Sequence, residues 1–221
     1  MATAMLGNGV YNLTEAARLT GLRPQRVREW FRGRTATAAP TDFPGDYRPV
    51  AGHLAISFHD LIEVFIAGQL RDKGVSLQFI RRVHAQLKGQ WKPDHPFCRV
   101  ELRTDGKRIF SCRLDEDGRG DVVDVRTGQK VFDTVLLPFL KKLDYDEATR
   151  LARRWAIAPL VVLDPAVGFG KPVVEKFGVS TRVLAAAFAA NGRDAAAVAA
   201  MFGVDEPHVR AAVAFEGRLA A

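Results

Sequence analysis

The chain has 221 residues and a formal net charge of +7, and 48% of its residues are hydrophobic. This length suits two or three small domains with buried cores. No stretch is long and apolar enough to predict a membrane-spanning helix, and the first residues lack the pattern of a secretory signal. The two cysteines, Cys98 and Cys112, have no metal-type or redox-type pairing, so we expect a cytoplasmic protein.

The positive charge is concentrated in the first part of the chain. Residues 1–92 hold 13 Lys or Arg against 7 Asp or Glu, residues 93–158 hold 13 against 12, and residues 159–221 hold 6 against 6. The pattern of apolar and polar residues also changes near Pro93 and near Pro159, which lie at these limits. We therefore expect three domains, 1–92, 93–158 and 159–221, and a polyanionic partner for the first.

The opening residues predict a helix-turn-helix. Asn12 and Glu15 have the spacing of a capping box at a helix start. Gly21 is suited to end that helix, and Pro24 to occupy the first turn of the next one. Two short helices joined through a glycine turn form this motif.

The second of these helices, residues 24–32, has an apolar and a basic face. Val27, Trp30 and Phe31 are expected to face the core. The outward residues are arginine-rich, and arginine suits both phosphate and guanine edges in the major groove. A solvated helix with scattered charge is the alternative, although Glu29 is the only acid there. The predicted DNA-binding residues here are Arg23, Gln25, Arg26, Arg28, Arg32 and Arg34.

The rest of the chain predicts an α+β protein. A short strand is expected within residues 53–58, followed by amphipathic helices over 58–74 and 76–89. Alternating residues between turn dipeptides predict three to four antiparallel strands over 97–137, and a helical stretch is expected over roughly 134–155. The last segment predicts two short strands and then three helices that begin near Ser180, Asp194 and Asp205.

The last segment also repeats the opening motif. The sequence "AAMFGVDEPHVRAA" aligns with "ARLTGLRPQRVREW" when Gly203 is placed on Gly21. Asp205 and His208 then stand where the first copy has Arg23 and Arg26, so we expect the second copy to be an interaction module. Its apolar residues should form a small core, and some should also serve a dimer or partner interface, because a unit of this size buries limited surface. The candidates are Phe188, Met201, Phe202, Val209, Val213 and Phe215.

Other short motifs lack the residues or the spacing that a phosphate-binding or metal-binding site requires. "GFGKP" lacks the glycine and the Ser or Thr that a phosphate loop needs. His95 and Cys98 have ligand-like spacing but make an incomplete zinc set. No catalytic constellation is evident, so we expect neither an enzyme nor a cofactor or metal.

Two stretches carry a resemblance to a known family. "YNLTEAARLTGLRPQRVREW" and "SFHDLIEVFIAGQLRDKGVSLQFIRRV" resemble the winged helix-turn-helix of MerR-type regulators over about residues 10–88. The resemblance implies a wing that contacts phosphates. Leu54 stands where the family often has an arginine, so Arg48 or His53 would have to make this contact. The long dimerisation helix and cysteine-bearing loop of metal-sensing members do not follow.

The last segment, about residues 159–217, is similar to a small bacterial domain found in antitoxins that pair with PIN-like ribonuclease toxins. Asp164, Gly170, Lys171, Pro172 and Arg182 match its pattern, although Ser180 and Thr181 replace a glycine-threonine pair. Together the two resemblances indicate a VapB-type antitoxin. They imply a nucleoid-associated homodimer that binds its own operator in double-stranded DNA, represses its own operon and neutralises a PIN-like toxin by direct binding.

Two alternatives come from other classes of protein. One is a MerR-like regulator without a toxin, whose later domains sense a small molecule. The other is a DNA-processing or nucleotide-modifying enzyme that uses acids of the middle segment.

Overall fold

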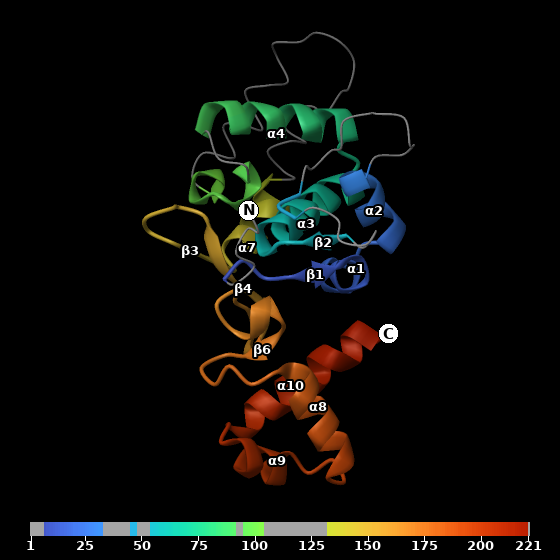
Figure 1. The fold of residues 1–221 in the computed structure, drawn as a ribbon, viewed down its shortest axis with the longest axis vertical. Coiled ribbons are helices and arrows are strands. Elements are labelled where there is room, and N and C mark those ends of the chain that lie inside the picture. Colours follow the sequence, from blue (N-terminus) through green and yellow to red (C-terminus); the bar gives the residue numbers. More distant parts are fainter. Residues whose placement is uncertain (1–6, 33–44, 48–53, 92–94, 104–131, 221) are drawn as a thin grey trace. The chain divides into compact units, whose positions relative to one another are not determined.

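The computed structural model describes residues 7–32, 45–47, 54–91, 95–103 and 132–220, and it mixes helices with short antiparallel strands (Figure 1). The α+β prediction is therefore confirmed. The chain divides into two compact units, an N-terminal unit (Tyr11–Ala152) and a C-terminal unit (Met1–Val10 with Arg153–Ala221). This division differs from the three domains expected from the sequence, because it puts both sides of the expected boundary at residues 92 and 93 into one unit.

The N-terminal unit opens with a short strand that the sequence did not predict, β1 (Tyr11–Asn12). The two predicted helices, α1 (Leu13–Thr20) and α2 (Pro24–Arg32), follow it. The Asn12 side chain accepts a hydrogen bond from the amide of Glu15 at 2.9 Å, and the Glu15 carboxylate accepts one from the amide of Asn12 at 3.0 Å. Gly21 ends α1 in the left-handed region at φ 72°. Local signals alone therefore set both ends of α1.

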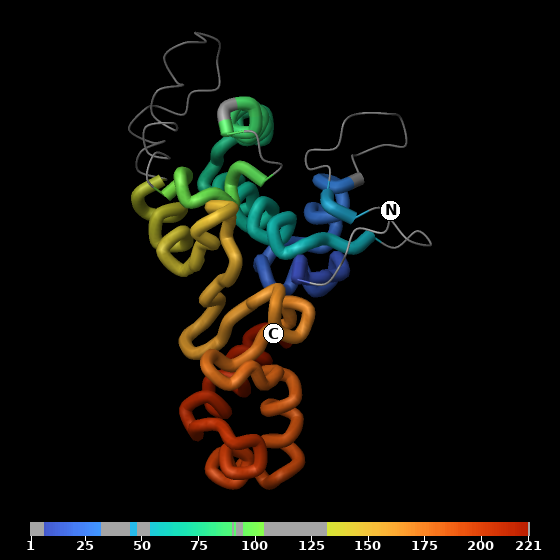
Figure 2. Tube along the Cα trace, turned by 60° about the vertical axis from the view of Figure 1, so that its left-hand side comes forward, coloured from blue at the N-terminus to red at the C-terminus, as the bar shows by residue number. Residues whose placement is uncertain are grey.

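Helix α3 (Phe58–Asp72) is the centre of the N-terminal unit. It follows β2 (Ala55–Ile56), which pairs antiparallel with β1. The helix contacts α1, α4 (Leu77–Trp91), the 3₁₀ helix η1 (Pro96–Cys98) and the π-helix η2 (Phe132–Leu136), as the tube in Figure 2 shows. Its sequence predicts an amphipathic helix, but these neighbours bury it on nearly all sides. The fully buried side chains include those of Phe58, Leu61, Ile62, Val64, Ile66 and Leu70.

Helix α4 buries the face that its spacing predicts, because Ile80, Val83 and Leu87 are each at most 1% exposed. His84 lies on the same face, and its Nε2 is 2.9 Å from Oε2 of the buried Glu63 on α3. The other carboxylate oxygen of Glu63 accepts a hydrogen bond from the amide of Phe97 at 2.9 Å. One carboxylate thus joins α3, α4 and η1.

The strands predicted at the two ends of residues 97–137 are wrong. Pro96–Cys98 forms η1, residues 100–103 are helical, and η2 continues into α7 (Leu137–Leu140). Phe97 and Leu102 are fully buried, so packing within the unit overrides the local alternation of apolar and polar residues. The other strands predicted between these ends fall on residues 104–131, which lie outside the described residues.

The helical stretch predicted over residues 134–155 is wrong beyond Leu140. Strands β3 (Leu143–Tyr145) and β4 (Ala152–Ala158) replace it, and a turn joins them. Oδ1 of Asp146 accepts hydrogen bonds from the amides of Ala148 and Thr149 and from the Thr149 hydroxyl, at 2.8–3.1 Å. An aspartate that bonds the backbone two and three residues ahead favours a turn over a helix interior.

The C-terminal unit is close to its prediction. Strands β5 (Val161–Leu163) and β6 (Val173–Val174) follow β4 in the sheet order β3-β4-β5-β6, and the short 3₁₀ helix η3 (Gly168–Gly170) lies between them. The three predicted helices are α8 (Thr181–Ala190), α9 (Ala195–Phe202) and α10 (Glu206–Ala220). They enclose a small apolar core that contains Val174, Leu184, Val198, Val204, Val209 and Ala212.

An ion-pair network ties residues 99–101 to the turn between β3 and β4. The Arg99 guanidinium donates to both oxygens of Glu101 at 2.9 Å, and Nε of Arg150 donates to the same carboxylate at 2.6 Å. These two arginines lower the pKa of Glu101 to about 2. The side chains of Glu101 and Arg99 are 18% and 17% exposed, whereas that of Arg150 is 52% exposed.

We predict that Glu101→Gln lowers the free energy of unfolding at pH 7 by about 1–3 kcal/mol, the range for a hydrogen bond to a charged group. The depressed pKa means that the carboxylate stabilises the fold fully above its ordinary value of 4.5 and loses this effect as the pH falls toward about 2. The difference between variant and wild type should therefore shrink over that range. Urea unfolding at pH 7 and pH 3 measures it, and a difference that does not depend on pH would contradict the assignment.

Candidate nucleic-acid interface

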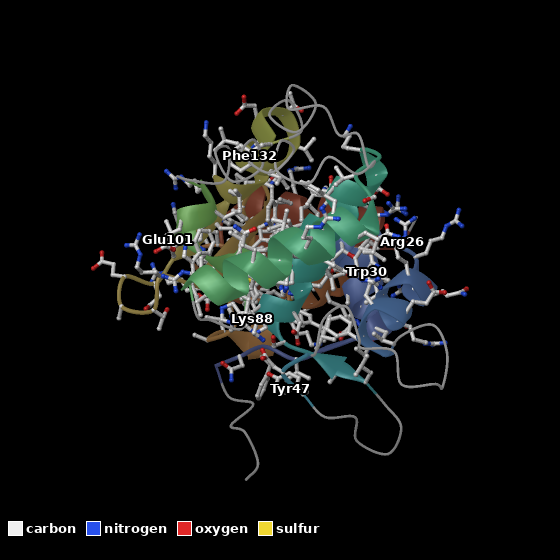
Figure 3. All side chains as sticks on the ribbon, turned by 90° about the horizontal axis from the view of Figure 1, so that it is seen from above. Arg26, Trp30, Tyr47, Lys88, Glu101 and Phe132 are labelled. Atoms are coloured by element: carbon white, nitrogen blue, oxygen red, sulfur yellow. The ribbon has the colours of Figure 1, made fainter. Side chains whose placement is uncertain are left out.

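Helix α2 has the two faces that its sequence predicts. Val27, Trp30 and Phe31 are 0%, 4% and 5% exposed, and Figure 3 shows Trp30 on the side of α2 that faces α3. These three anchors fix the rotation of the helix about its own axis. Arg23, Gln25 and Arg28 consequently lie on the exposed side.

Two of the outward residues have partners on the protein. Nη1 of Arg26 is 3.0 Å from Oδ1 of Asp72, at the end of α3, and the two side chains are 41% and 53% exposed. Nε2 of Gln25 donates to Oε1 of Glu29 at 3.1 Å. An exposed ion pair of this kind contributes only about 0–1 kcal/mol, so a phosphate group can compete for Arg26.

The start of α2 adds to the positive potential of this surface. The helix begins at Pro24, directly after the exposed Arg23. The first backbone amides of a helix have no partner within it, and together with the helix dipole they favour an anion at this end. Arg23 and the first turn of α2 thus concentrate positive potential at this end of the helix.

The remaining predicted DNA-binding residues are only partly placed. Arg32 is the last residue of α2. Arg34, Arg48 and His53 lie outside the described residues. The surface that the structure brings together therefore consists of Arg23, Gln25, Arg26 and Arg28.

An ion pair holds the short described segment 45–47 that follows α2 in the chain. Oδ1 of Asp46 is 2.9 Å from Nε2 of His95. Burial alone would lower the pKa of His95, but the hydrogen bond to Asp46 and the charges of nearby carboxylates raise this pKa to about 8. Burial would likewise raise the pKa of Asp46, and the bond and charge of His95 lower it instead. Both shifts favour the charged pair.

The second copy of the opening motif has the same backbone turn as the first. Gly21 and Gly203 have φ values of 72° and 64°, and the next amide, of Leu22 or Val204, donates to a carbonyl five residues earlier at 3.0 Å in both copies. The surfaces differ, because Asp205 and Glu206 open the second copy and Arg210 is paired with Glu206. The similar scaffolds therefore present different charges.

The apolar residues proposed for an interface fall into two groups. Val209 and Phe215 are 0% and 2% exposed, because both side chains are buried in the C-terminal unit. The prediction that these two residues lie on an interface is therefore wrong. Phe188 and Phe202 pack partly buried against that core, and Val213 is half-buried. Met201, at 60% exposed, remains available to a partner.

Three other apolar side chains of this unit are exposed, and two of them, Phe169 and Phe177, are not among the apolar residues that the sequence singles out. Phe169, Phe177 and Val183 are 57%, 36% and 46% exposed. Phe169 lies between two glycines and has a positive φ of 57°. The sequence "GFG" is typical of a turn, and a large apolar residue at a turn tip marks a candidate contact point.

Comparison with solved structures shows that this fold occurs elsewhere. The crystal structure of Rv2018 from Mycobacterium tuberculosis matches with a TM-score of 0.71 and 26% sequence identity, over 92% of this chain and 96% of that one. The chain therefore shares its fold with a solved bacterial protein over most of its length.

A comparison of sequences gives a relative with a functional name. The protein "Putative antitoxin VapB45" of Mycobacterium tuberculosis is 27% identical over 191 residues, which cover 77% of this chain and 78% of the relative. No protein-family model matches the chain. Within the described ranges, no helix is both long and apolar enough to cross a membrane.

Proposed function

We propose that the chain is the DNA-binding antitoxin of a toxin–antitoxin pair, which represses its own operon and neutralises a PIN-like ribonuclease by direct binding. The observation that carries the DNA-binding part is the fixed rotation of α2, with an apolar face that is at most 5% exposed and arginines on the opposite side. Similarity to a relative named as an antitoxin supports the pairing with a toxin.

In the proposed complex α2 enters the major groove. Arg28 and Gln25 reach base edges, for which arginine prefers guanine and glutamine prefers adenine. Arg23 and the first amides of α2 hold a phosphate, and Arg34, Arg48 and His53 add contacts from the loop and the wing expected from the sequence. A homodimer would present two copies of α2 to two half-sites of the operator.

The C-terminal unit is the proposed site of toxin binding. Residues 159–221 carry no net charge, and of the arginines of α2 the second copy keeps only a counterpart of Arg28, which is Arg210. The unit also exposes Met201 and Val183 on helices. Exposed apolar residues of this kind are common at protein interfaces. DNA binding and toxin binding would then use different units of the chain.

We predict that Arg28→Ala weakens binding to the DNA upstream of the gene by about ten- to a hundredfold, the equivalent of 1–3 kcal/mol for a lost base contact. Arg182→Ala on α8 removes the same charge from an exposed position of the C-terminal unit and serves as the control. Fluorescence anisotropy against salt concentration measures both variants, and a steep salt dependence is expected. Unchanged affinity of Arg28→Ala, with an intact circular dichroism spectrum, would overturn the groove assignment.

The ion pair between Arg26 and Asp72 gives a prediction of the opposite sign. Asp72→Asn removes the charge that competes with phosphate for Arg26, so DNA affinity at low salt should rise by about two- to fivefold, in line with the strength of an exposed ion pair. Glu147→Gln, in the exposed turn between β3 and β4, makes the same change in net charge elsewhere in the unit. A gain of equal size in the control would assign the effect to net charge alone.

The toxin partnership is tested by co-expression with the neighbouring open reading frame. We expect the chain to rescue growth and to co-purify with a PIN-like product. Arg28→Ala should still rescue growth while it loses repression of an operon reporter, because only DNA binding depends on this residue. A chain that represses the reporter but neither binds nor rescues would instead be a transcription regulator without a toxin.

A further inference from the structure

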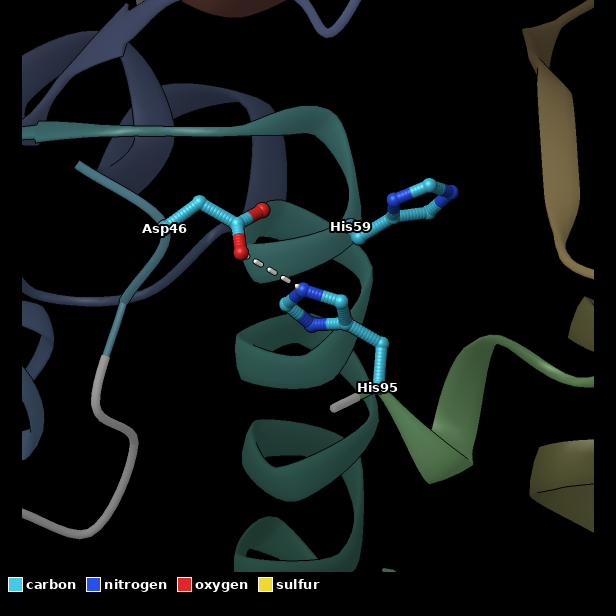
Figure 4. Close-up of side chains that lie close together, drawn as sticks. All are labelled: Asp46, His59 and His95. Carbon is cyan, nitrogen blue, oxygen red and sulfur yellow. Dashed lines mark hydrogen bonds and ion pairs between the residues drawn. The ribbon is translucent and has the colours of Figure 1, made fainter. Parts of the chain in front are cut away.

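Three side chains from separate segments meet beside the start of α3. Asp46 belongs to the segment 45–47, His59 is the second residue of α3, and His95 precedes η1. One potential ligand atom from each lies within 4.8 Å of the other two. Figure 4 shows Asp46 and His95 joined directly, with the His59 ring beside them.

A backbone carbonyl fixes the proton on the His59 ring. Nε2 of His59 is 2.8 Å from the carbonyl oxygen of Ala152. A carbonyl can only accept, so Nε2 carries the proton and Nδ1 keeps its lone pair. Histidines that bind metals have this arrangement, with one nitrogen held by a carbonyl or carboxylate and the other free to coordinate.

The backbone of Asp46 is also held in place. Its amide donates to Oδ2 of Asp60 at 3.0 Å, and Asp60 is itself 2% exposed. Oδ1 of Asp46 contacts Nε2 of His95 at 2.9 Å. The side chains of Asp46 and His95 are 35% and 13% exposed, so an ion could reach them from solvent.

We propose that Asp46, His59 and His95 bind one divalent transition-metal ion, and that Zn²⁺ suits the site. Two imidazoles and one carboxylate favour such an ion over Mg²⁺ and Ca²⁺, which prefer oxygen ligands. Bonds of about 2.0–2.1 Å in a tetrahedral site place ligand atoms roughly 3.3 Å apart. The observed spread of at most 4.8 Å therefore closes by small side-chain rotations. A water molecule would take the fourth position, and the ion would displace to solvent the proton that His95 carries in its pair with Asp46.

Cys98 is not a ligand of this site, although its spacing from His95 suggests one. The thiol is fully buried, and Sγ donates to the backbone carbonyl of His59 at 3.3 Å. The ion would cross-link the segment at Asp46, the first turn of α3 and the start of η1. Its predicted effect is on the stability of the N-terminal unit, and it does not depend on the proposed DNA and toxin binding.

The test uses the full chain without an affinity tag, stripped with EDTA and dialysed. Titration calorimetry with ZnSO₄ should give one ion per chain, and saturating Zn²⁺ should raise Tm by about 5 °C or more. Co²⁺ should give the visible absorption of a low-coordinate nitrogen and oxygen site, and MgCl₂ should give neither signal.

Variants separate a built site from adventitious binding. Asp46→Asn and His59→Gln should each weaken Zn²⁺ binding at least tenfold, and Asp46→Asn nearly preserves side-chain shape if His59→Gln fails to fold. His208→Gln, a histidine of α10 in the C-terminal unit, should bind like wild type. The proposal is overturned if wild type does not bind Zn²⁺, or if folded Asp46→Asn binds it as tightly as wild type does.

Discussion

The burial of α3 on nearly all sides is the constraint on which the N-terminal unit depends. Each large aliphatic side chain removed from water contributes about 1.5–3 kcal/mol, and α3 buries a run of them. The neighbouring elements are held by specific contacts as well. A Cβ on Gly68 would lie 2.7 Å from Leu22, and the Phe65 and Phe139 rings are 4.3 Å apart. The position of α2, and hence of its arginines, follows from this packing.

Local signals in the sequence predict those parts of the fold that local physics decides. The capping pair Asn12 and Glu15, the left-handed Gly21 and the cap at Asp194 each act within a few residues, and the structure has all three. The spacing of Val27, Trp30 and Phe31 likewise predicts the buried face of α2, because helix geometry alone decides which residues share a face.

Contacts between segments distant in sequence decide the rest of the fold, and there the local sequence pattern predicts the wrong structure. Alternation around Arg99–Arg103 suggests a strand. This segment is instead held by the buried side chains of Phe97 and Leu102 and by the hydrogen bond that the Phe97 amide donates to Glu63. The cluster of Asp46, His59 and His95 is equally hidden, because its members are far apart in sequence and meet only through packing on α3. The spacing of His95 and Cys98 suggests Cys98 as a ligand, but the Cys98 thiol donates to the backbone carbonyl of His59.

The division of the chain has a consequence for how it is made. Residues 7–10 belong to the same unit as residues 153–220: the Val10 amide donates to the Phe169 carbonyl, and the Val10 carbonyl accepts from Nζ of Lys171. During synthesis the N-terminal unit can fold as soon as Ala152 has left the ribosome, since domains tend to fold as units. Residues 7–10 can join their unit only after residues 153–220 have been made, so the C-terminal unit is completed after the N-terminal one.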